Sequence, residues 1–295
     1  MISPIENNGA PAAPSFAKAL IVEGGAMRGI FSTGVLDSFL AAQFNPFDLL
    51  LGVSSGAANL AAYLARMPKR NFNIYTDYSL RPEFISLKRF VRGGHLMDLD
   101  WLWDKTIAEI RLDLQTIFAT NKLFLIGLTD VATGEAIYKQ TDGDRLEDVL
   151  KASSAMPIVY RKFPLLDGRP TVDGGISDPL PVEAAIERGA RKIMVIRSRP
   201  KHYKKREMLS NAVLRWKLKP YPALRKAIAG RVRKYNEALS LMRTPPPGVS
   251  ILEICPPDDF RSARFGRNKG ILVDGYQQGQ RMGELAMRSW AHGMD

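Results

Sequence analysis

Two short apolar runs near the start of the chain each lead into a glycine-rich turn and then into a helical pattern. Lys18–Val22 and residues 47–53 read as buried strands, and the helical patterns follow at residues 29–44 and 54–66. Strands that alternate with helices in this way favour a parallel sheet, because a parallel neighbour needs a long crossover connection. We therefore expect a three-layer α/β/α fold with a mainly parallel central sheet.

The same patterns continue along the chain. Further strands are expected at residues 122–128, 136–138, 171–172, 192–197 and 249–255, and helices at 144–153, 181–188 and 270–292. The aromatic region 71–120 is expected to be loosely helical. Because a strand is expected after a basic segment, we expect one catalytic domain over residues 17–295. It would carry a basic excursion at about 197–245 and a C-terminal strand and helix, preceded by a mobile tail at 1–16.

Composition excludes several classes of protein. The chain of 295 residues is 45% hydrophobic and 24% charged, which excludes wholesale disorder. Its single cysteine, Cys255, excludes a disulfide framework and suits a reducing compartment. Three histidines argue against a histidine-rich metal site, and no apolar run is long enough to span a bilayer. We expect a cytoplasmic protein without metal or other cofactor.

Gly52, Ser54 and Gly56 fit the pattern G-x-S-x-G at the end of the second predicted strand. A strand leading in and a helix leading out are the setting of a nucleophile elbow, whose sharp turn raises the serine above the sheet. The free N–H groups of the helix would then point toward the anion formed on attack. An ordinary Gly/Ser turn is the alternative, because the short pattern also arises by chance.

A second glycine-rich turn, at residues 24–29, follows the first predicted strand. It would supply N–H groups to an oxyanion hole, with Arg28 holding an anionic head group or bracing the loop. The alternatives are a plain strand-to-helix turn and a dinucleotide loop. A dinucleotide loop is disfavoured because Ala26 replaces its second glycine and because Asp48 lies at the start, not the end, of the next strand. No Gly-Lys-Ser/Thr follows, which excludes a P-loop.

Asp173, followed by two glycines, is the best-placed candidate base for Ser54. None of His95, His202 and His292 follows a recognisable strand, as the base of a triad usually does. An aspartate needs desolvation or a pre-aligned serine to act as the base. The alternative for Asp173 is an ordinary aspartate-glycine turn.

Together these residues resemble the patatin-like phospholipase family of lipid acyl hydrolases. That family combines a glycine-rich oxyanion loop, a G-x-S-x-G elbow and a D-G-A/G aspartate, in this order and without a histidine. The matching segments are 23–29, 52–56 and 173–175, with 129–135 resembling its T-D-x-x-T-G-E hairpin and 153–157 its S-x-A-x-P stretch. The resemblance covers about residues 17–197 and leaves 198–295 without a placed motif.

The resemblance implies a patatin-like fold with Ser54 as nucleophile and Asp173 as its base. It implies an oxyanion hole made by the N–H groups of Gly24, Gly25 and Ala26. The supporting motif residues are Arg28, Gly29, Gly52, Gly56, Gly174 and Gly175. Ala26 stands where the family has a third glycine, and Glu23 where it has an aspartate. Alanine keeps the N–H, but a positive φ would cost it about 1 kcal/mol or more.

The net charge of +12 is concentrated between residues 197 and 234, which hold fourteen lysines and arginines and one glutamate. Cations interleaved with aromatic and aliphatic residues suit a surface that lies on an anionic membrane. The alternatives are a solvated helical face and, ranked last, nucleic-acid binding. The membrane contact would be made by Lys201, Lys204, Lys205, Arg206, Arg215, Lys217, Arg231 and Arg233.

We therefore expect a serine lipid acyl hydrolase of phospholipase A or esterase type, acting peripherally at a membrane. It would cleave a phospholipid or other acyl-ester lipid through an acyl-enzyme. The rivals are a catalytically silent, basic lipid- or nucleic-acid-binding protein on the same fold and a dinucleotide-binding oxidoreductase.

Overall fold

The computed structural model of the chain describes residues 17–140, 143–206 and 218–292, so the expected tail at 1–16 lies outside the described residues. The strands are β1 Lys18–Val22, β2 Leu49–Val53, β3 Leu123–Asp130, β4 Ala136–Lys139, β5 Leu165–Leu166, β6 Arg169–Asp173, β7 Lys192–Ile196 and β8 Ser250–Ile254. The helices are α1 Ile30–Ala41, α2 Ser55–Leu64, α3 Arg70–Thr76, α4 Leu87–Val91, α5 Leu99–Ile110, α6 Leu114–Phe118, α7 Leu146–Ser153, α8 Val182–Glu187, α10 Pro222–Arg243 and α11 Lys269–Ala291, with 3₁₀ turns that include η1 Ala26–Gly29 and η4 Gly174–Ile176.

The strands form one mixed sheet in the order β5-β6-β3-β2-β1-β7-β8, with β4 paired to β3. The five strands from β3 to β8 along this order run parallel, whereas β4 and β6 are antiparallel to β3. The carboxyl ends of the parallel strands meet at one edge, where ligands bind in open α/β sheets. The mainly parallel sheet expected from the sequence is confirmed.

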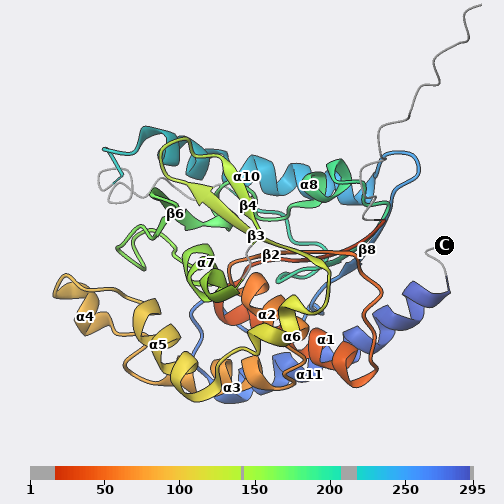
Figure 1. Cartoon of the computed structure of the whole chain (residues 1–295), viewed down its shortest axis with the longest axis horizontal. Helices are drawn as coiled ribbons and strands as arrows, with labels where there is room; N and C mark the ends of the chain where they lie inside the picture. Colours follow the sequence, from red (N-terminus) through yellow and green to blue (C-terminus); the bar gives the residue numbers. More distant parts are fainter. Residues whose placement is uncertain (1–16, 141–142, 207–217, 293–295) are drawn as a thin grey trace, which may run out of the picture.

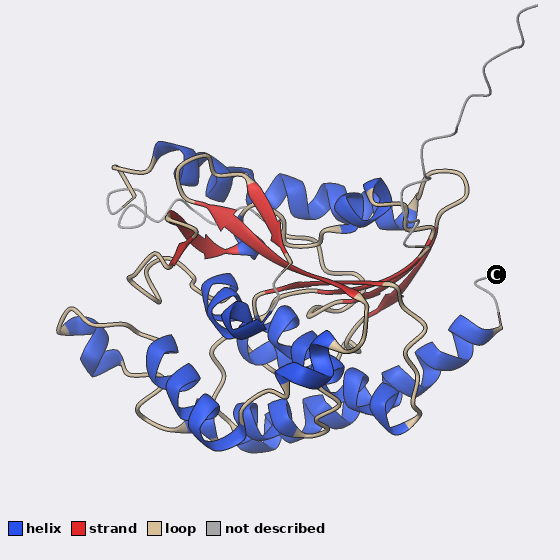
Figure 2. Cartoon of the chain, in the orientation of Figure 1, coloured by secondary structure: helices blue, strands red, loops and turns tan. Residues whose placement is uncertain are grey.

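Helices cover both faces of the sheet, which gives the three-layer α/β/α fold (Figures 1 and 2). Because neighbouring residues of a strand point to opposite faces, β1 contributes to two cores. Leu20 and Val22 pack in the core with residues of α1, α2 and α11. Ala19 and Ile21 pack in the core beneath α8 and α10.

The basic segment that was expected to be an excursion includes helix α10, which forms part of a helical layer on one face of the sheet. Helix α10 buries Tyr235, Leu239 and Met242 against the sheet, at the spacing of one helical face. Leu218 is also buried. The apolar residues of this segment therefore pack inward to a large extent, and its exposed cations are what remains for the predicted membrane surface.

Helices α1 and α11 pack with almost no gap between their backbones. A Cβ atom on Gly34 of α1 would collide with the carbonyl oxygen of Tyr276, and one on Gly279 of α11 would collide with that of Phe31. Gly275, Gly279 and Gly283 follow one another at four-residue intervals, so they form a groove that admits α1. The C-terminal helix is in this way fixed to the helix that follows the glycine-rich loop.

Two helices of the described residues exceed twenty residues, α10 and α11, and both carry charged side chains along their length. Within the described ranges, no helix combines the length and the apolar character needed to cross a bilayer.

Gly279→Ala should lower the free energy of unfolding by about 1–3 kcal/mol, because the new methyl group forces α1 and α11 apart. Gly230→Ala, within α10, is the matched control. Among the described residues no atom lies within 4 Å of a Cβ at Gly230, so the control should gain about 0.5–1 kcal/mol of helix propensity. Urea denaturation of both variants measures the difference. Equal effects would mean that the helix contact is not tight.

Candidate active site

Ser54 lies in the sharp turn between β2 and α2, with a φ of 54° and a ψ of −129°. A backbone in this region costs a non-glycine residue about 1–3 kcal/mol and persists only where the surroundings hold it. Here the N–H of Ser54 donates to the hydroxyl of Ser153 over 2.8 Å, and that hydroxyl donates to the carbonyl oxygen of Gly127 over 2.6 Å. Ser153 is fully buried and so ties the turn to β3.

Glycines let the neighbouring backbone approach this turn. A Cβ atom on Gly24 would lie 2.8 Å from the carbonyl oxygen of Val53 and 2.9 Å from Cβ of Ser54. One on Gly52 would lie 2.5 Å from Cα of Ala57. Because no side chain fits at either position, the glycine-rich loop after β1 lies directly against the turn after β2. The two motifs that the sequence separates are neighbours in the fold.

The glycine-rich loop presents N–H groups at this point. Gly25 donates its N–H to the hydroxyl of Ser55 over 2.8 Å, so this donor is engaged. Among the described residues, the N–H groups of Gly24 and Ala26 have no acceptor. Ala26 has a φ of 49°, the left-handed conformation that glycine would adopt without strain. Two of the three predicted oxyanion donors are therefore available for a ligand.

Arg28 braces the loop. Its guanidinium is buried and donates to the carbonyl oxygen of Ser198 over 3.2 Å and to the hydroxyl of Ser198 over 3.5 Å. Burial, followed by repulsion from Arg199, lowers the pKa of Arg28 to about 10. Of the two roles considered for Arg28, the contacts support bracing.

Asp173 is the last residue of β6 and is held by three hydrogen bonds. Its carboxylate accepts from the N–H of Gly175 over 2.8 Å. Its carbonyl oxygen accepts from the hydroxyl of Thr129 over 2.9 Å, and its N–H donates to the carbonyl oxygen of Ala155 over 3.0 Å. Thr129 and Ala155 belong to the hairpin and S-x-A-x-P segments noted in the sequence, so both segments position this aspartate.

The register of the sheet places Ser54 and Asp173 at the same level. Val53 is paired with Gly127 of β3, and Asp173 is paired with the next residue of β3, Leu128. Gly127 and Leu128 are also paired with β4, so β2 and β6 both lie on the other side of β3. The carboxyl ends of β2 and β6 therefore meet there, which brings the two residues together. Both residues are buried, at 8% and 5% exposure, and both line one pocket.

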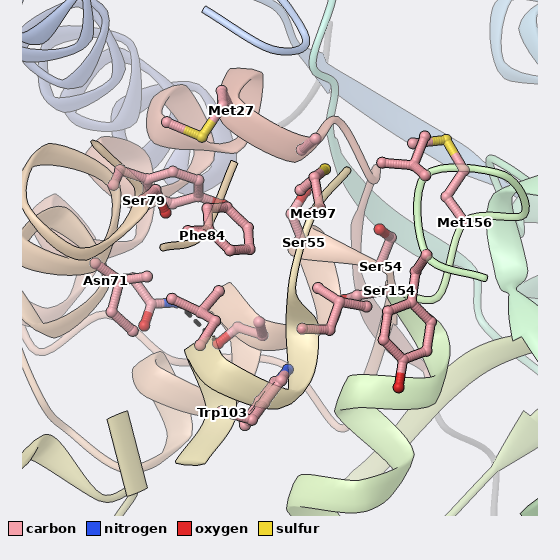
Figure 3. Close-up of a pocket in the computed structure, with 18 of the residues that line it drawn as sticks. Met27, Ser54, Ser55, Asn71, Ser79, Phe84, Met97, Trp103, Ser154 and Met156 are labelled. Atoms are coloured by element: carbon pink, nitrogen blue, oxygen red, sulfur yellow. Dashed lines mark hydrogen bonds between the residues drawn. The ribbon is translucent and has the colours of Figure 1, made fainter. Parts of the chain in front are cut away.

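The pocket is mainly apolar. Figure 3 shows Ser54 on one side, near Ser154 and Met156, and Asn71 and Ser79 on the opposite side. Most of the wall comes from α3, α5 and the segments beside them. Its apolar side chains are Met27, Ala58, Ile74, Tyr75, Phe84, Met97, Leu99, Leu102, Trp103, Met156, Val159 and Tyr160. Such a lining suits a fatty acyl chain better than a polar substrate.

All three histidines lie in the described part of the chain, and none lines this pocket. His95 accepts a hydrogen bond from the N–H of Arg161 and stacks on Tyr160, while His202 pairs with Asp258 at the surface. Within the described residues, no group of three or more His, Cys, Asp or Glu side chains is arranged to hold a metal ion.

The sequence did not reveal the roles of two residues at the site, Ser153 and Arg264. Ser153 was noted within a motif, but its hydrogen bond to the Ser54 turn depends on a contact across the sheet. Arg264, in the segment before α11, lines the pocket although no motif marks it.

The cations predicted for a membrane surface divide into three groups. Lys201, Lys204, Arg206 and Arg233 are exposed, whereas Lys205 and Arg231 are partly buried. Arg215 and Lys217 lie outside the described residues.

Comparisons with known proteins find similarity at the level of families and of individual proteins. A family model described as patatin-like phospholipase matches residues 20–186, and one described as a domain of unknown function (DUF6363) matches residues 221–295. The chain is 36% identical over 272 residues to the uncharacterized protein YjjU of Escherichia coli (strain K12), covering 90% of this chain and 75% of that protein.

Two further similarities are more distant. The chain is 22% identical over 192 residues to the probable lipid hydrolase 463L of Invertebrate iridescent virus 6, covering 59% of this chain and 65% of that protein. Among solved structures, VipD from Legionella pneumophila aligns with a TM-score of 0.46 and 14% identity, over 93% of this chain and 67% of that chain.

Ser153→Ala should lower the free energy of unfolding by about 1–3 kcal/mol, because it leaves a buried N–H and a buried carbonyl oxygen without partners. Ser154→Ala is the matched control, since the Ser154 hydroxyl donates only to the carbonyl oxygen of Leu150, one helical turn earlier. The control should cost less than about 1 kcal/mol. Chemical denaturation measures both, and a Ser153→Ala variant as stable as the control would contradict the bracing role.

Proposed function

The chain belongs to the patatin-like phospholipase family, and on this premise we propose that it is a serine lipid acyl hydrolase that cleaves fatty acyl esters through Ser54 and Asp173. The family supports a lipid hydrolase. The dyad and the acyl-enzyme are the finer parts of the proposal.

The observation that carries the proposal is the strained backbone of Ser54 beside a buried carboxylate in an apolar pocket. Backbone strain of this kind persists where a fold holds a residue in place for chemistry. Ser54 and Asp173 line the same pocket, and the rest of that pocket is mainly apolar. A nucleophile at one side of an apolar pocket fits an ester with a long acyl chain.

In the first half-reaction, the hydroxyl oxygen of Ser54 bonds to the ester carbonyl carbon while its proton passes to the carboxylate of Asp173. The carbonyl oxygen becomes an oxyanion, which the N–H groups of Gly24 and Ala26 would stabilise. When the carbon–oxygen bond to the leaving alcohol breaks, Asp173 returns the proton to that oxygen. The acyl group then remains on Ser54 as an ester.

In the second half-reaction, a water molecule gives a proton to Asp173 and its oxygen bonds to the acyl carbon. When the bond between the acyl carbon and Ser54 breaks, Asp173 returns the proton to the Ser54 oxygen and the fatty acid leaves. Asp173 works as a base because Ser54 is held in place by Ser153, which removes much of the entropic cost of alignment.

Exposed cations beside α10 support contact with an anionic membrane. Lys201, Lys204 and Arg206 project from the segment that follows β7, and Arg233 projects from α10. Each cation near an anionic lipid surface contributes about 1 kcal/mol to binding. The proposed enzyme would work as a peripheral protein on such a surface.

Ser54→Ala should lower kcat/KM for a p-nitrophenyl fatty ester by at least about a thousandfold, because the bond-forming oxygen is lost. Asp173→Asn should lower it comparably, since an amide cannot accept the proton. An alkyl fluorophosphonate, which labels activated serines, should modify the Ser54 peptide of the parent alone. Hydrolysis by Ser54→Ala at the parent rate would refute the dyad.

If the protein without substitutions shows no esterase activity, the interpretation changes. If the parent and Ser54→Ala show the same background rate, both on the soluble ester and on phospholipid vesicles, the protein is a binding protein that retains the fold. Circular dichroism and the melting temperature of both proteins provide the control for folding.

Reversing Lys201, Lys204 and Arg206 to glutamate should weaken binding to anionic vesicles by at least about 100-fold. The matched control reverses three exposed cations on α11, on the opposite side of the sheet (Figure 1): Lys269, Arg281 and Arg288. Both variants have the same net charge. Vesicle co-sedimentation should separate them, and an equal loss in both would show that net charge, not this surface, governs binding.

A further inference from the structure

Three cations from separate parts of the chain converge beside Asp173. Arg264 lines the pocket that contains Ser54. Arg231 of α10 approaches from the side of Gly175, where a Cβ atom would lie 3.3 Å from a terminal guanidinium nitrogen of Arg231 and 3.0 Å from the carboxylate of Asp173. Lys205 interacts electrostatically with both arginines.

These cations are partly withdrawn from water and repel one another. Burial, followed by repulsion from Arg231 and Arg264, lowers the pKa of Lys205 to about 7. Burial, followed by repulsion from Arg231, also lowers the pKa of Arg264. Within the described residues, the Nε atoms of Arg231 and Arg264 are buried without a hydrogen-bond partner.

Two carboxylates offset part of the charge of the cluster, since Asp173 attracts Arg264 and Glu23 attracts both Arg264 and Lys205. Glu23 accepts the N–H of Ser198 over 2.6 Å, and Asp173 accepts that of Gly175. The ion pairs in this part of the described chain are made by Arg197, Arg233 and Arg243. Because Arg28 and Arg199 also repel members of the cluster, the cations outnumber these two carboxylates. An excess of partly buried positive charge destabilises a fold, so the cluster indicates a place for an anion.

The cluster is held in place by the backbone. The side chain of Asn236 accepts the N–H of Lys205 and donates to its carbonyl oxygen, each over 3.0 Å, which fixes Lys205 to α10. The carbonyl oxygen of Arg264 accepts the N–H of Met27, next to the glycine-rich loop. The cations are therefore positioned relative to both the sheet and the proposed oxyanion donors.

We propose that Lys205, Arg231 and Arg264 bind the phosphate of a glycerophospholipid whose acyl ester lies at Ser54. This inference rests on the proposed function and narrows the substrate from acyl esters in general to lipids with a phosphodiester. In such a lipid a short glycerol linker separates ester from phosphate, which fits a cluster beside the catalytic pocket. Arginine is suited to the site because its planar fork donates two hydrogen bonds to one phosphate.

Binding can be measured without catalysis. The protein carrying Ser54→Ala is titrated calorimetrically with three probes: dihexanoylphosphatidylcholine, dihexanoylglycerol and inorganic sulfate. The two lipids are kept below the concentrations at which they aggregate. We expect the phospholipid to bind at least about tenfold more tightly than the neutral diacylglycerol. Adding Arg231→Gln or Lys205→Gln should remove most of that difference, whereas Lys226→Gln, at an exposed position of α10, should preserve it.

Two outcomes would overturn the proposal. Equal affinity for the phospholipid and the diacylglycerol would show that the cluster does not recognise the phosphate. Sulfate that binds as tightly as the phospholipid and displaces it fully would indicate a site for free anions. Neither result depends on hydrolysis, so failure here is distinguishable from failure of the Ser54–Asp173 mechanism.

A second measurement separates binding from a structural role. If the cluster exists to bind an anion, Arg231→Gln should raise the melting temperature in sulfate-free buffer, because it relieves repulsion, and should reduce the stabilisation gained from sulfate. If Arg231 instead braces the fold, the substitution lowers the melting temperature in both buffers. That result would overturn the proposal.

Discussion

The hydroxyl of Ser153 is the contact on which the geometry of the site depends. It accepts the N–H of Ser54 and donates to the carbonyl oxygen of Gly127, so one side chain connects the strained turn after β2 with β3. Strand β3 in turn pairs with β6, which ends at Asp173. A rigid sheet thus sets the separation of the proposed nucleophile and base, and loops contribute little freedom to it.

The sequence allowed the local part of this arrangement to be predicted. Buried apolar runs marked the strands, and glycines marked the turns at Ser54 and Asp173, because those features arise from neighbouring residues. The antiparallel pairing of β6 and the contact made by Ser153 depend on residues far apart in the chain. Periodicity does not encode such pairings, so the sequence could name Asp173 as the candidate base for Ser54 but could not show how the sheet brings the two residues together.

Helix α10 shows why a count of charges did not distinguish cations beside the pocket from cations on the exposed surface. Arg231 and Arg233 are two positions apart, which is a rotation of about 200° around a helix, so they point to nearly opposite sides. Arg231 lies at the pocket side near Gly175, whereas Arg233 is exposed and pairs with Glu237. The spacing of Tyr235, Leu239 and Met242 was the available signal that one face of this segment is buried.

The position of β1 has a consequence for synthesis of the protein. It is the first strand of the described residues but lies inside the sheet, between β2 and β7. One of its edges stays unpaired until Lys192–Ile196 has left the ribosome, an interval of about 10 to 30 seconds at ordinary translation rates. An apolar strand with an open edge pairs readily with other chains. The danger of misassembly is therefore greatest during translation, before the late strand that closes the sheet exists.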